Sequence, residues 1–192
     1  MPALILASTS PYRRALLERL QLPFTAIAPG VQEESIAGEL PADRALRLSL
    51  AKAQPIAARY PEAVVIGSDQ VAFDGDRVLG KPGDAASCRA QLARASGSSV
   101  RFYTGCALLG ARGTVRLVHL DTTTVFFRPL GTEEIARYVE RERPFDCAGG
   151  FRAEGLGIAL FESIESVDPT ALIGLPLIWL AGALRRAGCA LP

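Results

Sequence analysis

The segment LILASTSPYRRALLERL, residues 4–20, decides how the fold begins. Its short apolar start, within the run at 3–7, is typical of a buried strand. Ser10 is a good helix N-cap, and Pro11 suits the first helical position. The helix is expected to continue to about Leu20. A strand that leads directly into a helix is the first unit of an α/β arrangement.

The turn between this strand and this helix is suited to binding an anion. A helix N-terminus presents N–H groups and the positive end of the helix dipole. Ser8 adds a hydroxyl, and Arg13 adds positive charge in the first turn, where a cation opposes the dipole. A bound phosphate would explain that charge. From the residues alone, an ordinary capped helix with arginines on its surface is an equally good explanation. The sequence lacks the GxxxxGK[ST] pattern of a phosphate-binding loop.

Outward from this segment, strands first alternate with helices and later pair with each other. Apolar runs predict strands at 23–28, 63–67, 99–110 and 114–127, and helical patterns predict helices at 42–60, 84–95, 132–141 and 176–187. This order predicts one α/β domain, residues 1–192, in which helices flank a mixed sheet.

Turn signals refine this arrangement. Asp74-Gly75 predicts a tight hairpin, and Ala111-Arg112-Gly113 predicts that the two long strands around it form an antiparallel hairpin. Pro55 predicts a kink or break in the helix at 42–60. The glycine-rich stretch 146–160 is expected to be loop and strand.

The composition narrows the classes of function. The chain has 192 residues, of which 49% are hydrophobic and 21% charged, and its formal net charge is +1. These values predict a folded protein with no strong affinity for nucleic acid. The first apolar run is too short for a signal peptide or a membrane span. Four scattered cysteines and a single histidine, His119, do not suit a zinc site. We therefore expect a soluble cytoplasmic protein that has no membrane or nucleic-acid partner.

Single charged residues in four places are candidates for chemistry. Asp69 directly follows the apolar strand at 63–67, where a carboxylate can bind metal or act as a base. Lys81, in a Gly-Lys-Pro turn, and Lys52, inside a helix, can reach a phosphate or remain solvated. Glu33 lies in a polar loop and offers a carboxylate of the kind that Mg²⁺ prefers. A turn aspartate, solvated lysines and a solvated loop are the alternatives.

The order of these signals resembles the Maf family of nucleoside triphosphate pyrophosphatases. The matching segments span most of the chain: LILASTSPYRRALLERL at 4–20, AKAQ at 51–54, VIGSDQV at 65–71, GKP at 80–82, FYTG at 102–105, CAGGFRAEGLG at 147–157 and LIGLPL at 172–177. The resemblance implies a mixed α/β fold with two lobes around a cleft, similar to the inosine triphosphate pyrophosphatases. It is compatible with a homodimer.

The resemblance also implies a reaction and a set of site residues. Water attacks the α-phosphate of a nucleoside triphosphate, with Mg²⁺ or Mn²⁺ as cofactor, and pyrophosphate leaves. Asp69 corresponds to the general base, and Glu33 with Asp69 to the metal-binding carboxylates. The polyphosphate-binding positions of the family correspond to four residues of this chain: Ser8, Arg13, Lys52 and Lys81.

Three positions resemble the branch that hydrolyses 7-methyl-GTP. Tyr12, Gln70 and Glu154 stand where the dTTP/UTP-cleaving branch usually has Arg, Thr and Gln. An aromatic ring can stack on the positively charged N7-methylguanine, and a carboxylate can accept hydrogen bonds from its N–H groups. The alternatives are a dTTP/UTP pyrophosphatase and a nucleotide-binding regulator of septum formation or cell division.

Two positions depart from the family pattern. Position 12 is often Trp in the 7-methyl-GTP branch and is Tyr12 here, which offers a smaller stacking surface. The residue before Glu33 is usually Asp and is Gln32 here, so one carboxylate is missing from the expected metal site.

Overall fold

The computed structural model describes residues 2–110 and 113–192. Within this part of the chain, seven strands form one sheet in the order β2-β1-β3-β5-β6-β7, and β4 pairs with β3. β1 (Leu4–Leu6) pairs in parallel with both β2 (Thr25–Ala26) and β3 (Val64–Phe73). β4 (Val78–Leu79) is antiparallel to β3. The sheet is therefore mixed, which confirms the predicted fold class.

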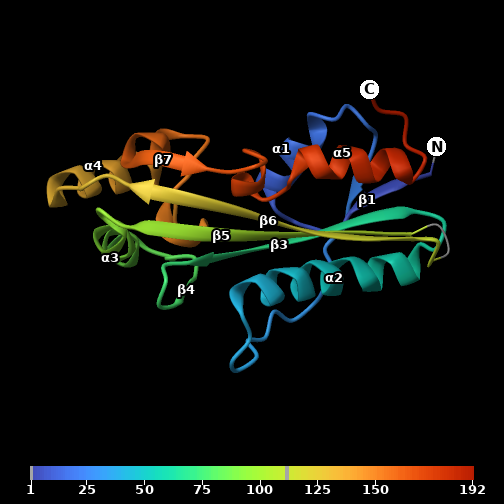
Figure 1. The fold of residues 1–192 in the computed structure, drawn as a ribbon, viewed down its shortest axis with the longest axis horizontal. Helices are drawn as coiled ribbons and strands as arrows, with labels where there is room; N and C mark the ends of the chain where they lie inside the picture. Colours follow the sequence, from blue (N-terminus) through green and yellow to red (C-terminus); the bar gives the residue numbers. More distant parts are fainter. Residues whose placement is uncertain (1, 111–112) are drawn as a thin grey trace. The chain divides into compact units, whose positions relative to one another are not determined.

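The two longest strands, β5 (Ser99–Gly110) and β6 (Val115–Phe127), are neighbours in the sheet. They run in opposite directions in Figure 1, as the predicted hairpin requires. Ala111 and Arg112, which the sequence places in its connection, lie outside the described residues. The hairpin at Asp74-Gly75 is confirmed, because the Asp74 N–H donates to the Arg77 carbonyl and joins β3 to β4.

Helix α1 (Pro11–Glu18) begins as the sequence predicts. Ser10 has an extended backbone, and its hydroxyl accepts a hydrogen bond from the Arg13 N–H, while Pro11 fills the first helical position. The other helices are α2 (Pro41–Arg59), α3 (Ala85–Ala95), α4 (Thr132–Glu142) and α5 (Leu177–Arg186).

Contacts divide the chain into two compact units. The first unit comprises Met1–Gln70, Tyr103–Asp121 and Asp168–Pro192, and it contains β1, β2, α1, α2 and α5. The second unit comprises Val71–Phe102 and Thr122–Val167, and it contains β4, α3, α4 and β7 (Phe161–Glu165).

Both faces of the first unit's central strands are covered by helices (Figure 1). Side chains alternate along a strand, so β1 sends Leu4 and Leu6 to one face and Ile5 to the other. The first face packs against α1 and α5, and the second packs against α2. This double burial explains why β1 and the start of β3 are continuous apolar runs rather than alternating ones.

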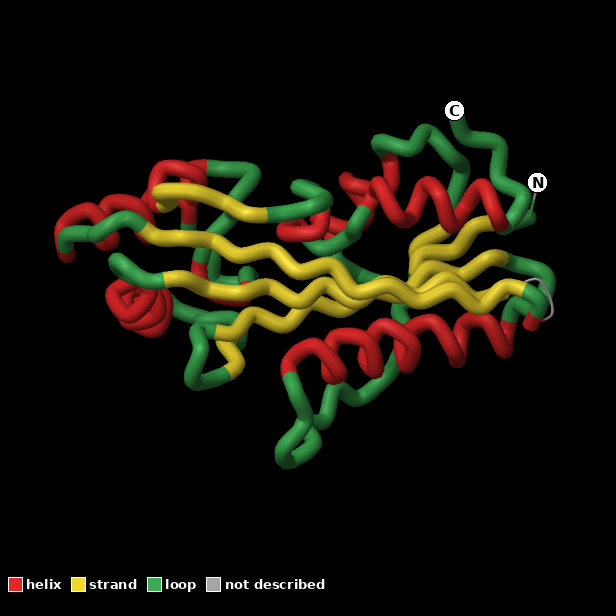
Figure 2. The backbone as a smooth tube through the Cα atoms, in the orientation of Figure 1, coloured by secondary structure: helices red, strands yellow, loops and turns green. Residues whose placement is uncertain are grey.

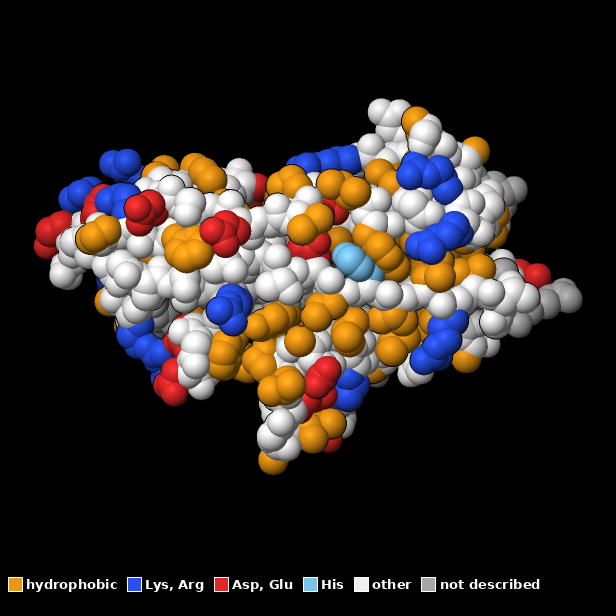
Figure 3. Space-filling view, viewed as in Figure 1, with side chains coloured by type: hydrophobic (Ala, Val, Ile, Leu, Met, Phe, Trp, Pro, Cys, Tyr) orange, Lys and Arg blue, Asp and Glu red, His pale blue; other side chains and the backbone are white. Residues whose placement is uncertain are grey.

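The second unit has an aromatic core. Phe151 makes edge-to-face contacts with Phe102, Phe127 and Phe161 at centroid distances of 4.9–5.5 Å. Such pairs stabilise a core beyond the apolar area that they bury. On the surface over α4, positive and negative side chains lie interspersed (Figure 3).

The expectations at Pro55 and at 146–160 are wrong in part. Of the kink or break predicted at Pro55, the break is absent, because α2 continues through this residue (Figure 2). The stretch 146–160 contains no strand; it forms two short 3₁₀ helices, Ala148–Gly150 and Leu156–Leu160, and the strand β7 follows it. Positive φ angles at Gly149 and Gly150 are incompatible with an extended strand there. Among the described helices, none combines the length and apolarity needed to cross a bilayer.

Candidate functional site

Three of the predicted site residues meet in the first unit. The Lys52 ammonium lies 2.5 Å from a carboxylate oxygen of Asp69 and 2.7 Å from a carboxylate oxygen of Glu33. Lys52 and Asp69 are buried, whereas the Glu33 side chain is 52% exposed. Two carboxylates therefore pair with one lysine ammonium in this site, and the Glu33 side is open to solvent. We call these three residues the carboxylate–lysine cluster.

Helix α2 presents Lys52 inward because it packs very closely on the sheet. A Cβ atom at Gly67 would lie 2.2 Å from the Ser49 carbonyl oxygen, and one at Gly105 would lie 2.3 Å from the Ala45 carbonyl oxygen. Only glycines on β3 and β5 permit this approach. Ala45, Ser49 and Lys52 follow the helical spacing that keeps residues on one face, so the close packing also brings Lys52 to the sheet.

Asp69 lies within β3, at the point where that strand leaves its apolar start. Burial raises the pKa of the Asp69 carboxyl above its ordinary value, and the adjacent Lys52 and Arg13 charges oppose that shift. Glu33 adds a further upward contribution, because it is a second carboxylate nearby. A buried carboxylate with a raised pKa is a better proton acceptor than an ordinary aspartate, which suits a general base.

Arg13 is held near the same cluster by the first turn of α1. Its Nε donates to the Gly174 carbonyl at 3.1 Å, and its charge interacts with Asp69 and Glu33. Burial lowers the pKa of its guanidinium, but arginine stays charged in proteins. Ser8 is buried just before this helix, and its hydroxyl accepts from the Ser10 N–H at 3.1 Å. A phosphate at this turn would meet a cation and a helix N-terminus.

The loop that carries Glu33 is fastened to α2 by Arg47. Its guanidinium donates to both carboxylate oxygens of Glu39, at 2.5 and 2.6 Å, and to the Glu34 carbonyl at 3.2 Å. This bidentate pairing lowers the pKa of Glu39 and gives the loop a defined attachment. Sequence reasoning missed Arg47, because its partners are 8 and 13 residues away in a loop without a recognisable motif.

Gln70 faces a loop rather than open space. Its amide nitrogen lies within 3.0 Å of the Thr104 hydroxyl and of the Ala171 and Leu172 carbonyls. Carbonyl oxygens only accept, so the NH₂ group must point at this loop and the amide oxygen must point the other way. Tyr12, which was predicted to stack on the base, is half-buried in the first turn of α1.

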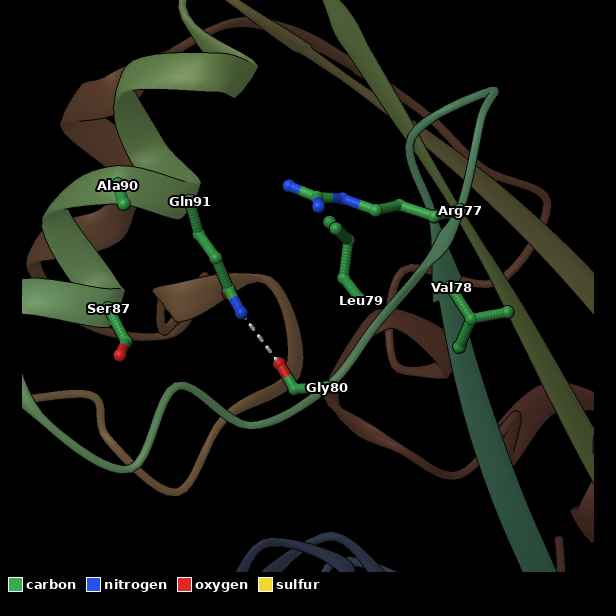
Figure 4. Close-up of a pocket in the computed structure, with 7 residues that line it drawn as sticks. All are labelled: Arg77, Val78, Leu79, Gly80, Ser87, Ala90 and Gln91. Atoms are coloured by element: carbon green, nitrogen blue, oxygen red, sulfur yellow. Dashed lines mark hydrogen bonds between the residues drawn. The ribbon is translucent and has the colours of Figure 1, made fainter. Parts of the chain in front are cut away.

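The remaining predicted residues, Lys81 and Glu154, belong to the second unit, and both are exposed. Lys81 comes directly after Gly80, which is one of the residues that line a pocket of about 360 Å³ between the β4 hairpin and α3 (Figure 4). In that pocket the Gln91 amide donates to the Gly80 carbonyl at 3.1 Å. The pocket is lined by Arg77, Val78, Leu79, Gly80, Ser87, Ala90 and Gln91.

Thus the structure brings Arg13, Lys52, Asp69 and Glu33 into one charged site, with Ser8 at the start of α1. The loop before α5 also contributes to this site, although the candidates chosen from the sequence do not include it. In the structure its Gly174 carbonyl contacts both Arg13 and the Ser68 hydroxyl. An Asp-x-Thr pattern before a glycine is a turn signal, but it does not reveal distant partners.

The donor set fits a divalent cation that arrives with a phosphate ligand. Within the described residues, no group of three or more His, Cys, Asp or Glu side chains is gathered closely enough to hold a metal ion alone. However, Glu33 and Asp69 converge on one atom, the Lys52 ammonium nitrogen. Mg²⁺ is commonly bound by one or two carboxylates together with substrate phosphates, which matches this pair.

Comparisons with known proteins identify relatives of this chain. A protein of Xanthomonas axonopodis pv. citri named 7-methyl-GTP pyrophosphatase is 53% identical, and one of Pseudomonas aeruginosa with the same name is 51% identical; each match covers 100% of both chains. The Ham1 protein of Staphylococcus aureus aligns at a TM-score of 0.47 with 14% identity, over 79% of this chain and 88% of that one. A likeness at that score is too weak to support a conclusion.

The model of the family described as Maf-like protein matches residues 3–187, which is nearly the whole chain. The matched range includes the carboxylate–lysine cluster, Arg13, and the two predicted site residues of the second unit, Lys81 and Glu154. The segments that first suggested the resemblance lie within the same range. The chain belongs to the Maf family.

Proposed function

We propose that this protein hydrolyses 7-methyl-GTP to 7-methyl-GMP and pyrophosphate. The observation that carries the proposal is the carboxylate–lysine cluster, in which buried Asp69 lies beside Lys52 with the Arg13 charge nearby. Relatives more than half identical over the whole chain bear the name of this activity. Both units then belong to a single Maf-like domain, residues 1–192, that acts on a soluble nucleotide in the cytoplasm.

In this proposal Asp69 acts on the attacking water. Its carboxylate accepts a hydrogen bond from the water, orients it toward the α-phosphorus and takes its proton as the P–O bond forms. Burial raises the pKa of Asp69, so the carboxylate has a greater affinity for that proton. The bond between the α-phosphorus and the bridging oxygen breaks, and pyrophosphate leaves with the electron pair.

Cations offset the negative charge that accumulates on the leaving group. Arg13, Lys52 and Lys81 would bind the polyphosphate, with the Ser8 hydroxyl at the start of α1. Positive groups fixed before the reaction stabilise the transition state without reorganisation. Glu33 and Asp69 would hold a divalent ion, Mg²⁺ or Mn²⁺, which when bound supplies further positive charge to the phosphate oxygens.

Base recognition would depend on Tyr12, Gln70 and Glu154. The N7-methyl group leaves the guanine ring positively charged, so the Tyr12 ring can attract it by about 0.5–2 kcal/mol. The Glu154 carboxylate can accept hydrogen bonds from the guanine N1–H and its exocyclic amine. Gln70, whose NH₂ group faces a loop, has its amide oxygen left as the group that can face a ligand.

The test is pyrophosphate release from a panel of nucleotides. Purified protein is assayed with 7-methyl-GTP, GTP, dTTP, UTP, CTP and ITP, each with Mg²⁺, Mn²⁺ or EDTA. We expect release that depends on a divalent metal and is fastest with 7-methyl-GTP.

Two other outcomes would change the proposal in different ways. Faster release from dTTP or UTP would retain the reaction and overturn the assigned base preference. Absence of release from every nucleotide, with nucleotide binding intact, would overturn the reaction and favour the regulatory alternative for this family.

A further inference from the structure

The loop between β7 and α5 is tied together by two side chains. Asp168 accepts hydrogen bonds from the Thr170 N–H at 2.9 Å and from the Ile178 N–H at 2.6 Å, the latter in the first turn of α5. Thr170 lies with its hydroxyl 2.6 Å from Asp168, 2.8 Å from the Leu175 carbonyl and 2.9 Å from the Leu177 N–H, from which it accepts. We call residues 168–178 the stapled loop.

The interior of the stapled loop turns its carbonyl groups toward the site. The Gly174 carbonyl accepts from the Arg13 Nε at 3.1 Å and lies 2.8 Å from the Ser68 hydroxyl. The Ala171 carbonyl accepts from Gln70 at 2.9 Å and from the Thr104 hydroxyl at 2.9 Å. Three carbonyls of one short loop, counting Leu172, therefore fix side chains on α1, β3 and β5.

Gly174 is suited to this role by its backbone. Its φ angle is +125°, a conformation that other residues rarely adopt. A Cβ atom there would lie 3.3 Å from both the Cγ and the Nε of Arg13, so the Arg13 side chain packs directly against the glycine. The direction of the Gly174 carbonyl consequently sets the direction of the guanidinium.

We propose that Thr170 is a positioning residue that acts through the stapled loop to aim Arg13 and Gln70. Removing its hydroxyl releases the Leu177 N–H and the closure of the loop, and the Gly174 and Ala171 carbonyls then lose their fixed places. This inference rests on the proposed pyrophosphatase function, because Arg13 and Gln70 are assigned there to phosphate and base recognition.

The stapled loop also connects the two kinds of recognition. Arg13 is assigned to the polyphosphate and Gln70 to the base, and both depend on carbonyls of residues 171–174. A looser loop should therefore weaken catalysis and base preference together. A purely structural role would lower only the stability of the fold.

The test uses Thr170→Val, which keeps the shape and removes the hydroxyl, and Thr170→Ser, which keeps the hydroxyl. Ser96→Ala is the matched control, because the Ser96 hydroxyl accepts from the Leu130 N–H at 2.8 Å in the second unit. Each variant is assayed for pyrophosphate release from 7-methyl-GTP and from GTP with Mg²⁺, and its thermal midpoint is measured.

We expect Thr170→Val to lower kcat/KM for 7-methyl-GTP by about 10- to 100-fold, since small misplacements of binding groups have effects of this size. The ratio of 7-methyl-GTP to GTP turnover should fall as well. Thr170→Ser should stay within about threefold of the wild type, and Ser96→Ala should lower the thermal midpoint with little change in kcat/KM.

A double-mutant cycle identifies the route through Arg13. In Arg13→Lys, which lacks the Nε donor, the added Thr170→Val change should cost clearly less than it does in the wild type, because the part of its effect that passes through Arg13 is already lost and only the part through Gln70 remains. Fully additive losses would overturn the proposal. If Thr170→Val does not fold, Asp168→Asn replaces it in the same cycle, since it weakens the same staple.

The outcomes separate this inference from the function on which it rests. A wild-type protein that releases no pyrophosphate overturns the proposed function, and the positioning role with it. An active wild type whose Thr170→Val variant behaves like Ser96→Ala overturns the positioning role alone.

Discussion

The predicted site residues of the two units differ in how firmly they are held. In the first unit, Lys52 and Asp69 are buried in an ion pair at 2.5 Å, and Arg13 is hydrogen-bonded to a backbone carbonyl. In the second unit, Lys81 and Glu154 are exposed. Charges that act on a breaking bond are effective when they are fixed in advance and shielded from water. We therefore expect the first unit's residues to carry the chemistry of the proposed reaction, and Lys81 and Glu154 to contribute to binding alone.

A substitution at Asp69 tests most directly whether the first unit carries the chemistry. We expect Asp69→Asn to lower kcat by about 10²- to 10⁴-fold, the usual contribution of a general base. Binding of 7-methyl-GTP, measured by calorimetry, should change far less. Asp76→Asn, at an exposed turn, is the control. Near-normal turnover by Asp69→Asn would contradict the role of Asp69 as the general base.

The pH profile tests the charges around the same carboxylate. Asp69 must be ionised to accept a proton. Therefore kcat/KM should have its full value above the pKa of Asp69 and should decline as the pH falls through that pKa. Burial raises the pKa of Asp69, and Lys52 opposes the shift. Without a bound divalent ion this shift places the pKa of Asp69 above the ordinary aspartate value of about 3.9. A bound divalent ion favours the carboxylate, so the acid limb should move to lower pH as the Mg²⁺ concentration rises.

Lys52→Met should move that limb to still higher pH, because it removes the charge that favours the carboxylate, and should lower kcat/KM by about tenfold or more at neutral pH. Lys81→Met removes the same charge from the second unit and should weaken substrate affinity without moving the limb. An unchanged limb in Lys52→Met would contradict the coupling between Lys52 and Asp69.

Glu154→Gln tests the recognition that is assigned to the second unit. A hydrogen bond to a charged group contributes about 1.5–3 kcal/mol, so kcat/KM for 7-methyl-GTP should fall by about tenfold or more. The loss for dTTP should be much smaller, since thymine does not offer the same pair of donors. Glu162→Gln, also exposed in the second unit, is the control. Equal losses on all nucleotides would show that Glu154 does not read the base.

The smallest expected effect comes from Tyr12, which sharpens the comparison because it belongs to the first unit. Tyr12→Leu should lower kcat/KM for 7-methyl-GTP by about 3- to 10-fold relative to GTP, since cation–π attraction is modest in partly exposed sites. Tyr12→Phe should retain the preference. Steady-state kinetics with both nucleotides decide this point, and an unchanged ratio in Tyr12→Leu would exclude stacking by this residue.

Much of the fold follows from local patterns in the sequence. Ser10 and Pro11 mark the start of α1 because their preferences are set by the backbone of the first turn. The unbroken apolar runs predict doubly covered strands correctly, since both faces of β1 meet helices. The strand at β7 was missed because it is short and half-exposed, so it lacks the continuous apolar run that marks the buried strands.

The contacts within the site were less accessible from the sequence. Whether Lys52 turns inward depends on how closely α2 approaches the sheet, and that depends on Gly67, which is 15 positions away. The bond between Arg13 and Gly174 joins residues 161 positions apart. Neither periodicity nor capping rules describe such pairs. The family resemblance predicted which residues form the site, and the structure shows the contacts that hold them.

The most direct test of the central claim is the fate of the oxygen from water. Turnover of 7-methyl-GTP in ¹⁸O-labelled water is followed by mass spectrometry of both products. Attack at the α-phosphorus, beside Asp69, predicts one labelled oxygen in 7-methyl-GMP and none in pyrophosphate. Label in pyrophosphate, or release of inorganic phosphate in its place, would contradict the proposed reaction.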